Sequence, residues 1–305
     1  MPLFASQEFE GTWDILIIDS GSTDDTLNIV RKYPRVTVHE IPNGEFGHGR
    51  TRNLALQLKE ADYYLFTVQD ATPPSQQWLQ NHASIIEAYN LDALCGGQAV
   101  PHDLDKNPVQ WHRPLNSGPI LKKVTAGEFQ SASPSEKARL CEWDNVNAIY
   151  KASSLLDTPF PDVRFGEDKA WAKTRLEDAG AIGYSFNNRV WNYHHQSHSF
   201  AYARESSAMF WNHKHFEVIP SSRRFGWLRF VLVTIKTIVC TSKIYSLKDV
   251  LFWLDYNIRI QKSKLKAKQA FLNAHSLGHS AIDQWYNGIG KKSPVATPQQ
   301  QRHLP

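Results

Sequence analysis

Apolar runs that stop at an acidic residue constrain the fold of this chain more than any other feature. The segment 14–19 (DILIID) is rich in β-branched residues and ends at Asp19, and the segment 63–68 (YYLFTV) is followed by Gln69 and Asp70. Continuous apolar runs of this length are typical of strands covered on both faces. Helical patterns alternate with such runs over residues 14–100, which predicts an α/β fold with a mostly parallel, Rossmann-like sheet.

The sequence divides into three parts of different character. We expect an α/β domain over residues 1–220, a basic amphipathic helical appendage over 221–285 and a disordered tail over 286–305. The pattern predicts strands at 14–19, 36–41, 63–68, 93–100, 181–186 and 189–195, helices at 50–61, 76–89, 167–180, 200–216, 226–241 and 247–275, and long loops over 101–143.

Composition and charge narrow the class of protein. The 305 residues are 41% hydrophobic and 21% charged, as in a soluble globular protein, and three widely spaced cysteines favour a reducing compartment. No signal peptide is visible, and the apolar segment 227–240 is shorter than the roughly 20 residues that span a bilayer. We therefore expect a cytoplasmic protein, for which peripheral contact with the inner face of the plasma membrane is one alternative.

The net charge of +4 is concentrated after residue 220. A basic segment of this kind favours contact with anionic lipid, with a solvated helix face, a lid or a dimer surface as the alternatives. Nucleic acid is not expected, because no motif that reads bases is present.

Two acidic residues are expected where strands end. In an open α/β sheet, ligands bind beyond the carboxyl ends of the strands, so Asp19 and Asp70 should lie together at one end of the sheet. Asp19 could accept hydrogen bonds from a nucleotide base or ribose, while the backbone of Ser20 and Gly21 favours phosphate oxygens. The alternative for Asp19 is a turn that caps the next helix.

Asp70 is a candidate ligand for a divalent cation. Mg²⁺ uses one or two carboxylates together with substrate phosphate oxygens and water, although a turn-capping aspartate explains the pattern equally well. His194 and His195 are candidate metal ligands or diphosphate contacts. A zinc site of three histidines is disfavoured, since no partnering cysteine or HExxH pattern accompanies them.

Two further segments carry candidate binding and catalytic residues. Arg50, Arg52 and Asn53 follow a glycine-rich stretch (GEFGHGRTRN), where arginine forks suit phosphate oxygens. Glu167 and Asp168 open a predicted helix. Asp168 is either the N-cap of that helix or a general base that takes the proton of an acceptor hydroxyl.

Five segments occur in a fixed order along the chain: IIDSGSTDDT, EFGHGRTRN, TVQDATP, FGEDKAWAKTRLEDAG and VWNYHHQSHS. Together they resemble the motifs of the inverting family-2 glycosyltransferases of GT-A fold, especially those of the rhamnosyltransferase-like branch. The resemblance covers about residues 5–215. It implies a GT-A (nucleotide-diphospho-sugar transferase) fold, a nucleoside-diphosphate sugar donor, a glycan or lipid-linked acceptor, and Mg²⁺ or Mn²⁺.

The resemblance also implies a role for each candidate residue. The sugar nucleotide would be contacted by Asp19, Ser20, Gly21, Arg50, Arg52, Asn53 and Asp70. The metal would be bound by Asp70, His194 and His195. Asp168 would be the base, and Glu167 beside it would place the acceptor. Only about a dozen residues precede DILIID, where the family has a first strand and helix, so we expect that strand to be lacking.

Two other functions are compatible with the sequence. One is a catalytically degenerate binding protein on a glycosyltransferase scaffold. The other is a sugar-nucleotide nucleotidyltransferase, but the GxGxR loop expected near its N-terminus is absent.

Overall fold

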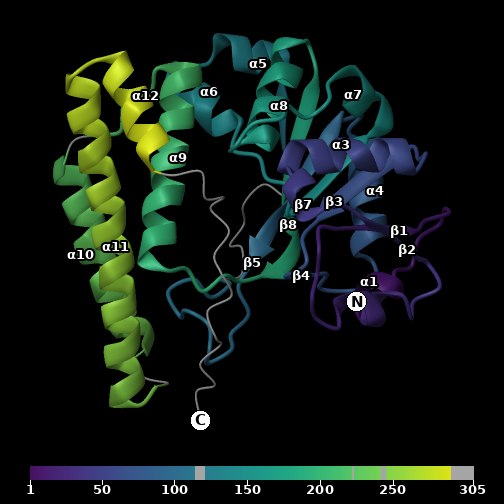
Figure 1. Cartoon of the computed structure of the whole chain (residues 1–305), viewed down its shortest axis with the longest axis horizontal. Coiled ribbons are helices and arrows are strands. Elements are labelled where there is room, and N and C mark those ends of the chain that lie inside the picture. The colour runs from purple at the N-terminus through teal and green to yellow at the C-terminus, as the bar shows by residue number, and fades with distance from the viewer. Residues whose placement is uncertain (114–120, 222, 242–244, 290–305) are drawn as a thin grey trace. The chain divides into compact units, whose positions relative to one another are not determined.

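The computed structural model describes residues 1–113, 121–221, 223–241 and 245–289 (Figure 1). The chain forms two compact units. Unit 1 contains Met1–Ala99 and Pro114–Asn192, and unit 2 contains Val100–Arg113 and Tyr193–Pro305. The domain boundaries at 220 and 285 stay a prediction from the sequence, and residues 290–305 of the expected tail lie outside the described residues.

Unit 1 is built on two sheets. Its strands are β1 (Ile15–Asp19), β2 (Val36–Glu40), β3 (Tyr63–Thr67), β4 (Ala71–Thr72), β5 (Ala93–Ala99), β6 (Leu121–Thr125), β7 (Asn147–Lys151) and β8 (Ala181–Asn192). Among the described residues, β1 and β2 form a parallel pair, and the other strands form a second sheet in the order β3-β7-β5-β8-β4, with β6 also on β8. The α/β class is confirmed.

Strand directions in the larger sheet are mixed. β5 and β8 are parallel, whereas β7 lies antiparallel between β3 and β5, so β3, β5 and β8 all run the same way. β4 and β6 run antiparallel to β8. The sheet therefore contains three strands that run in one direction, β3, β5 and β8. The antiparallel strands lie between them (β7) or beside them (β4 and β6).

The helices of unit 1 flank these sheets. They are α1 (Pro2–Ala5), α2 (Thr26–Val30), the 3₁₀ turn η1 (Asn43–Glu45), α3 (His48–Leu58), α4 (Trp78–Ala88), α5 (Ala126–Ser131), α6 (Pro134–Leu140), α7 (Ala152–Asp157) and α8 (Glu167–Glu177). The prediction of loops over 101–143 is wrong for its second half, which contains β6, α5 and α6. A capping box between Ser133 and Glu136 begins α6 and is the sequence signal for it.

One long strand replaces the two short strands predicted over 181–195. The register of β8 against β5 jumps between Gly96 and Gly97, where β8 bulges. Asn147 holds this bulge, because its Nδ2 donates to the carbonyls of Gly97 (3.0 Å) and Asn188 (2.9 Å). A Cβ on Gly96 would lie 2.1 Å from that amide nitrogen, so only glycine fits there.

The core of unit 1 lies at the centre of the larger sheet. Ile86, Leu91, Leu94 and Ile149 form a fully buried cluster between α4 and the strands β5 and β7. In contrast, the apolar residues of β1 and β3 are only half-buried. Within the described part of the chain, each of these strands pairs on one side alone, which leaves their apolar side chains less covered than sequence patterns of this kind indicate.

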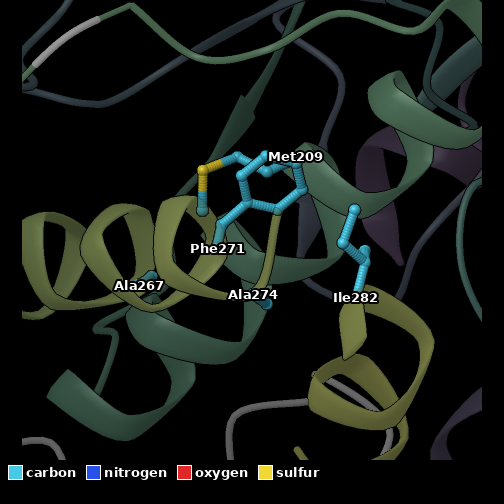
Figure 2. Close-up of a cluster of buried hydrophobic side chains, with 5 residues drawn as sticks. All are labelled: Met209, Ala267, Phe271, Ala274 and Ile282. Atoms are coloured by element: carbon cyan, nitrogen blue, oxygen red, sulfur yellow. The ribbon is translucent and has the colours of Figure 1, made fainter. Parts of the chain in front are cut away.

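Unit 2 is helical. It contains α9 (His198–Phe216), α10 (Arg223–Thr241), α11 (Leu247–Ser276) and α12 (His279–Gly288). The long α11 packs against the other three helices. Figure 2 shows the core of this unit, where Met209 of α9, Ala267, Phe271 and Ala274 of α11 and Ile282 of α12 meet. The predicted helices at 200–216, 226–241 and 247–275 are confirmed, and α12 was not anticipated.

Two further features bear on function. All three cysteines are free: Cys95 and Cys141 are buried, and Cys240 is partly exposed. Among the described residues, no helix combines the length and the apolar character needed to cross a bilayer.

Candidate active site

The start of α8 is anchored to α3 by an ion pair. Arg52 Nη1 lies 2.5 Å from Glu167 Oε1, and the two side chains are only 15% and 8% exposed. The same nitrogen donates to the carbonyl of His48 at 3.2 Å. The structure therefore brings together two predicted site residues that are 115 positions apart, and it commits Arg52 to a carboxylate of this protein.

Asn53 and Gly49 fix the loop that leads into α8. Asn53 donates to the carbonyl of Phe160 (2.8 Å) and accepts from the amide of the same residue (3.0 Å). A Cβ on Gly49 would lie 2.3 Å from the carbonyl oxygen of Pro161, so the helix and the loop approach closely only because position 49 is glycine. The HGRTRN segment thus positions Glu167 and Asp168.

Asp168 has an unusual electrostatic environment. Burial raises its pKa to about 7, the neighbouring Glu167 adds to the increase, and the amide of Lys169 and the Arg52 guanidinium oppose it. Its Oδ1 accepts from the amide of Lys169 at 2.7 Å. A carboxyl that titrates near neutrality can take up and release a proton under ordinary conditions.

Asp144 is a second acid near Asp168 that sequence reasoning missed. Its charge raises the pKa of Asp168 further, and its Oδ2 accepts from Gln98 Nε2 at 2.9 Å. Gln98 in turn accepts from Asn192 Nδ2 at 3.1 Å. Asp144 belongs to the segment EWDN just before β7, so an acid next to a buried strand was the only signal.

His48 was also missed. Burial lowers its pKa, and the Arg52 guanidinium contributes to the decrease, whereas Glu167 opposes it. Burial thus favours the neutral form of the imidazole beside the ion pair. His48 begins α3, and Arg52 lies one turn further along the same helix.

The carboxylate of Asp19 forms its hydrogen bonds with the loop that follows it. Its carboxylate accepts from the amides of Gly21 (2.9 Å) and Ser22 (2.8 Å) and from the Ser22 hydroxyl, and these bonds lower its pKa. Gly21 has a φ of +101°, a conformation that glycine adopts readily, and Ser20 lies between the two. These contacts form a turn, as in the alternative for Asp19, but they do not cap the next helix, because α2 begins later, at Thr26, with Asp25 at its N-cap.

Asp19 and Asp70 lie at or just beyond the ends of strands that belong to different sheets. Asp19 is the last residue of β1, whereas Asp70 lies in the turn between β3 and β4. The expectation of a single sheet for both is corrected by the strand pairing, because β1 pairs with β2 and β3 with β7. That the two carboxylates lie close together stays a prediction.

Arg50 lines a pocket of about 480 Å³ on unit 1. Other residues of the pocket include Ile41, Glu45, Asn53 and Asp162. The Arg50 guanidinium is next to the carbonyl of Phe46, with 3.4 Å between Nη2 and the oxygen. Arg50, one of the two arginines predicted to bind phosphate, therefore borders a cavity.

Asp70 could supply only part of the ligand set of a divalent cation. Among the described residues, no group of three or more His, Cys, Asp or Glu side chains is placed to hold a metal. Asp70 is half-buried at a turn and could supply one carboxylate oxygen. One such oxygen with diphosphate oxygens and water is a donor set that Mg²⁺ or Mn²⁺ accepts.

His194 and His195 belong to unit 2. His195 lies against Phe252, Trp253 and Tyr256, with ring centroids 6.3, 6.0 and 4.5 Å away, and burial lowers its pKa. Its Nδ1 is 3.2 Å from the Tyr193 hydroxyl. His195 is thus a packing residue in an aromatic cluster, and His194 next to it is exposed.

Comparison with known proteins identifies the class. Residues 4–145 match glycosyl transferase family 2. The matched part of the chain is therefore similar to a family-2 glycosyltransferase domain.

Part of the chain is also similar to two rhamnosyltransferases. It is 42% identical over 106 residues to the O-antigen chain rhamnosyltransferase WbaN of Salmonella anatum, a match that covers 34% of this chain and 33% of that protein. It is 33% identical over 99 residues to the O-antigen chain rhamnosyltransferase RfbN of Salmonella typhimurium, covering 32% and 31%. The matched part spans about a third of the length of these relatives.

Further likenesses are more distant. The poly(ribitol-phosphate) β-N-acetylglucosaminyltransferase TarS of Staphylococcus aureus is 26% identical over 215 residues, covering 67% of this chain and 33% of that protein. The crystal structure of TarS 1–349 superposes with a TM-score of 0.49 at 15% identity over 89% of this chain and 86% of that one. The mannosyltransferase PcManGT of Pyrobaculum calidifontis, solved with GDP-Man and Mn²⁺, gives 0.45 at 15% identity over 90% and 70%.

Proposed function

We propose that this chain transfers a sugar, rhamnose being the first candidate, from a nucleoside-diphosphate sugar to a hydroxyl of a glycan or lipid-linked acceptor, with inversion at the anomeric carbon. The observation that carries the proposal is the position of Asp168 in the first turn of a helix that the Arg52–Glu167 ion pair anchors to α3. Burial raises the pKa of this carboxyl to about 7, which suits a base. The family match over residues 4–145 and the rhamnosyltransferase relatives support the donor class.

In the proposed step, the Asp168 carboxylate takes the proton of the acceptor hydroxyl. The acceptor oxygen forms its bond to the anomeric carbon while the bond from that carbon to the diphosphate oxygen breaks, and the nucleoside diphosphate leaves with the electron pair. One base is sufficient, because a diphosphate leaving group needs charge neutralisation and not protonation. Attack from the face opposite the leaving group inverts the configuration.

Asp70 would hold the divalent cation. A bound Mg²⁺ or Mn²⁺ would neutralise negative charge on the diphosphate. Arg50, which borders the pocket on unit 1, is the candidate contact for phosphate oxygens, while Arg52 acts through Glu167.

Asp168→Asn tests the role of the base. Transfer should fall by about 10² to 10⁴-fold, the contribution of general base catalysis, while donor binding is kept. Asp178→Asn at the exposed end of α8 is the matched control and should retain activity. The measurement is product formation from dTDP-, UDP- and GDP-sugars with Mg²⁺ or Mn²⁺. Donor binding without turnover in the unaltered chain would support a degenerate binding protein instead.

We further propose that the protein works at the cytoplasmic face of a membrane, with residues 221–285 in peripheral contact. The basic character of this segment supports the proposal, since a lipid-linked acceptor would be found there. Flotation with vesicles tests this contact independently of sugar transfer.

A further inference from the structure

Helix α10 turns its polar side inward. Thr237 and Thr241 are fully buried, and each donates its hydroxyl to a backbone carbonyl four residues earlier, at 2.8 and 2.7 Å. Thr234 makes the same bond to Phe230 at 3.0 Å. Because these hydroxyls are satisfied within the helix, this face can pack against α11 without stranding a polar group.

The outward face of α10 is mainly apolar, with two exposed cations, Arg229 and Lys236, among its apolar residues. Its large apolar side chains between residues 227 and 239 are 40–62% exposed: Trp227, Leu228, Val231, Leu232, Ile235, Ile238 and Val239. We call this set the outer stripe. A surface helix of a soluble protein normally buries its apolar side chains and exposes its polar ones. In α10 this arrangement is reversed, because threonines are buried while leucine, isoleucine and tryptophan are exposed. Contact of the stripe with another apolar phase would remove this exposure.

A cationic pocket adjoins the outer stripe. Its volume is about 330 Å³, and Leu228 and Leu232 belong both to its lining and to the stripe. The polar lining contains three cations, Arg229, Lys264 and Lys268, and one acid, Glu205, whose Oε2 is 3.7 Å from Lys264 Nζ. Three cations against one carboxylate leave an excess of positive charge at the edge of the apolar stripe.

The charged form of Lys264 is disfavoured in this pocket. Burial lowers its pKa, and the like charges of Arg229 and Arg204 contribute to the decrease, while Glu205 opposes it. Burial also lowers the pKa of Lys268. An anion in the pocket would offset both the repulsion and the desolvation.

We propose that the outer stripe lies in the interface of an anionic membrane, and that the pocket formed by Arg229, Lys264 and Lys268 receives the phosphate of a lipid headgroup. This inference deepens the peripheral membrane contact of the proposed function. The stripe supplies the apolar area, and α10 contains no acidic residue that anionic lipid would repel. Leu228 and Leu232 would enter the acyl region beside the bound phosphate.

Flotation of the full chain with vesicles tests the pocket. The chain should float with phosphatidylcholine vesicles that contain phosphatidylglycerol and not with phosphatidylcholine alone. Lys264→Gln with Lys268→Gln should weaken binding about 25-fold, since each cation near an anionic surface accounts for about 5-fold. Lys262→Gln with Lys266→Gln removes the same charge from exposed positions of the same helix, outside the pocket lining, and should cost less than about 5-fold.

The stripe is tested in the same assay. Ile235→Ser with Val239→Ser should reduce flotation, whereas Leu277→Ser, at a residue that is 79% exposed outside the stripe, should leave it unchanged. Soluble glycerol phosphate at the same phosphate concentration should not displace the chain from vesicles, because it lacks acyl chains.

Three results would overturn the inference. Equal losses in the two lysine pairs would exclude a headgroup pocket, and displacement by soluble glycerol phosphate would assign the pocket to a free phosphate. Failure to float, with a dimer in sedimentation that Ile235→Ser dissociates, would assign the stripe to a second copy. Donor turnover without vesicles is measured on the same proteins, so a failure of the proposed sugar transfer remains separate from a failure of docking.

Discussion

Arg52 of α3 and Glu167 of α8 form an almost buried ion pair, with 2.5 Å between Nη1 and Oε1. The pair stands next to Asp168 and acts on it in two directions. Glu167 raises the pKa of Asp168 beyond the effect of burial, and Arg52 lowers it. The ion pair thus fixes the position of the candidate base and adjusts its proton affinity.

The pH dependence of sugar transfer should report this arrangement. Asp168 is protonated below its pKa of about 7 and cannot accept a proton there, so kcat/KM should rise with pH and level off above that value. Glu167→Gln removes a negative charge and should move the inflection to lower pH. Glu177→Gln at the exposed end of α8 is the control. An inflection that stays in place in Glu167→Gln would contradict the electrostatic role.

Removal of one member of the ion pair should destabilise unit 1. Arg52→Met leaves Glu167 buried without its partner, and we expect a loss of about 3 kcal/mol in the free energy of unfolding. Arg31→Met breaks the exposed pair with Glu40, where the two side chains are 52% and 56% exposed, and should cost less than about 1 kcal/mol. Urea denaturation measures both, and similar losses in the two variants would argue against a buried pair.

Gly49 offers a test of the contact between α3 and the loop before α8. Gly49→Ala places a Cβ 2.3 Å from the Pro161 carbonyl, so helix and loop must separate, at a cost of about 1–3 kcal/mol. Gly44→Ala adds the same methyl group where no atom lies within 4 Å and should be close to neutral. Thermal denaturation compares the two. Because the loop leads into α8, which contains Asp168, Gly49→Ala should also lower turnover.

Acid should weaken the helical unit through His213. Burial lowers its pKa, and His275 and His279 contribute, with ring centroids 5.3 and 5.7 Å away. A histidine whose pKa is lower in the folded state favours folding while it is neutral, so its contribution is intact above the unfolded pKa of about 6.5 and is lost as the pH falls below it. The helical signal in circular dichroism should melt at a lower temperature at about pH 5 than at about pH 7.5. His213→Phe should reduce this difference, and an unchanged difference would exclude His213 as the cause.

The local features of the fold could be predicted, and their pairing could not. The apolar runs ending at Asp19 and before Asp70 are strands β1 and β3, and the helical patterns at 200–216 and 247–275 are α9 and α11. Strand partners depend on contacts between distant segments, which one sequence does not encode locally. For that reason the separate pairing of β1 and the bulge in β8 came only from the structure.

The candidate site was predictable at the level of residues but not of contacts. The motifs singled out Arg52, Asn53, Glu167 and Asp168, which the structure does bring together. The sequence could not show which contact each residue makes, because an arginine that binds phosphate and an arginine paired to a buried glutamate can have the same local sequence. Asp144 lacks any motif, since its influence on Asp168 arises only when the chain folds.

The distribution of thiols gives α10 a natural reporter. Burial raises the pKa of Cys141 to about 12 and that of Cys95 well above its usual range, so both stay protonated and react slowly with maleimides. Cys240, near the end of α10, is the partly exposed thiol among the three cysteines of the chain. An environment-sensitive dye can therefore be attached to this helix in the unaltered protein, and its emission would follow the arrival of the helix at a lipid surface in real time.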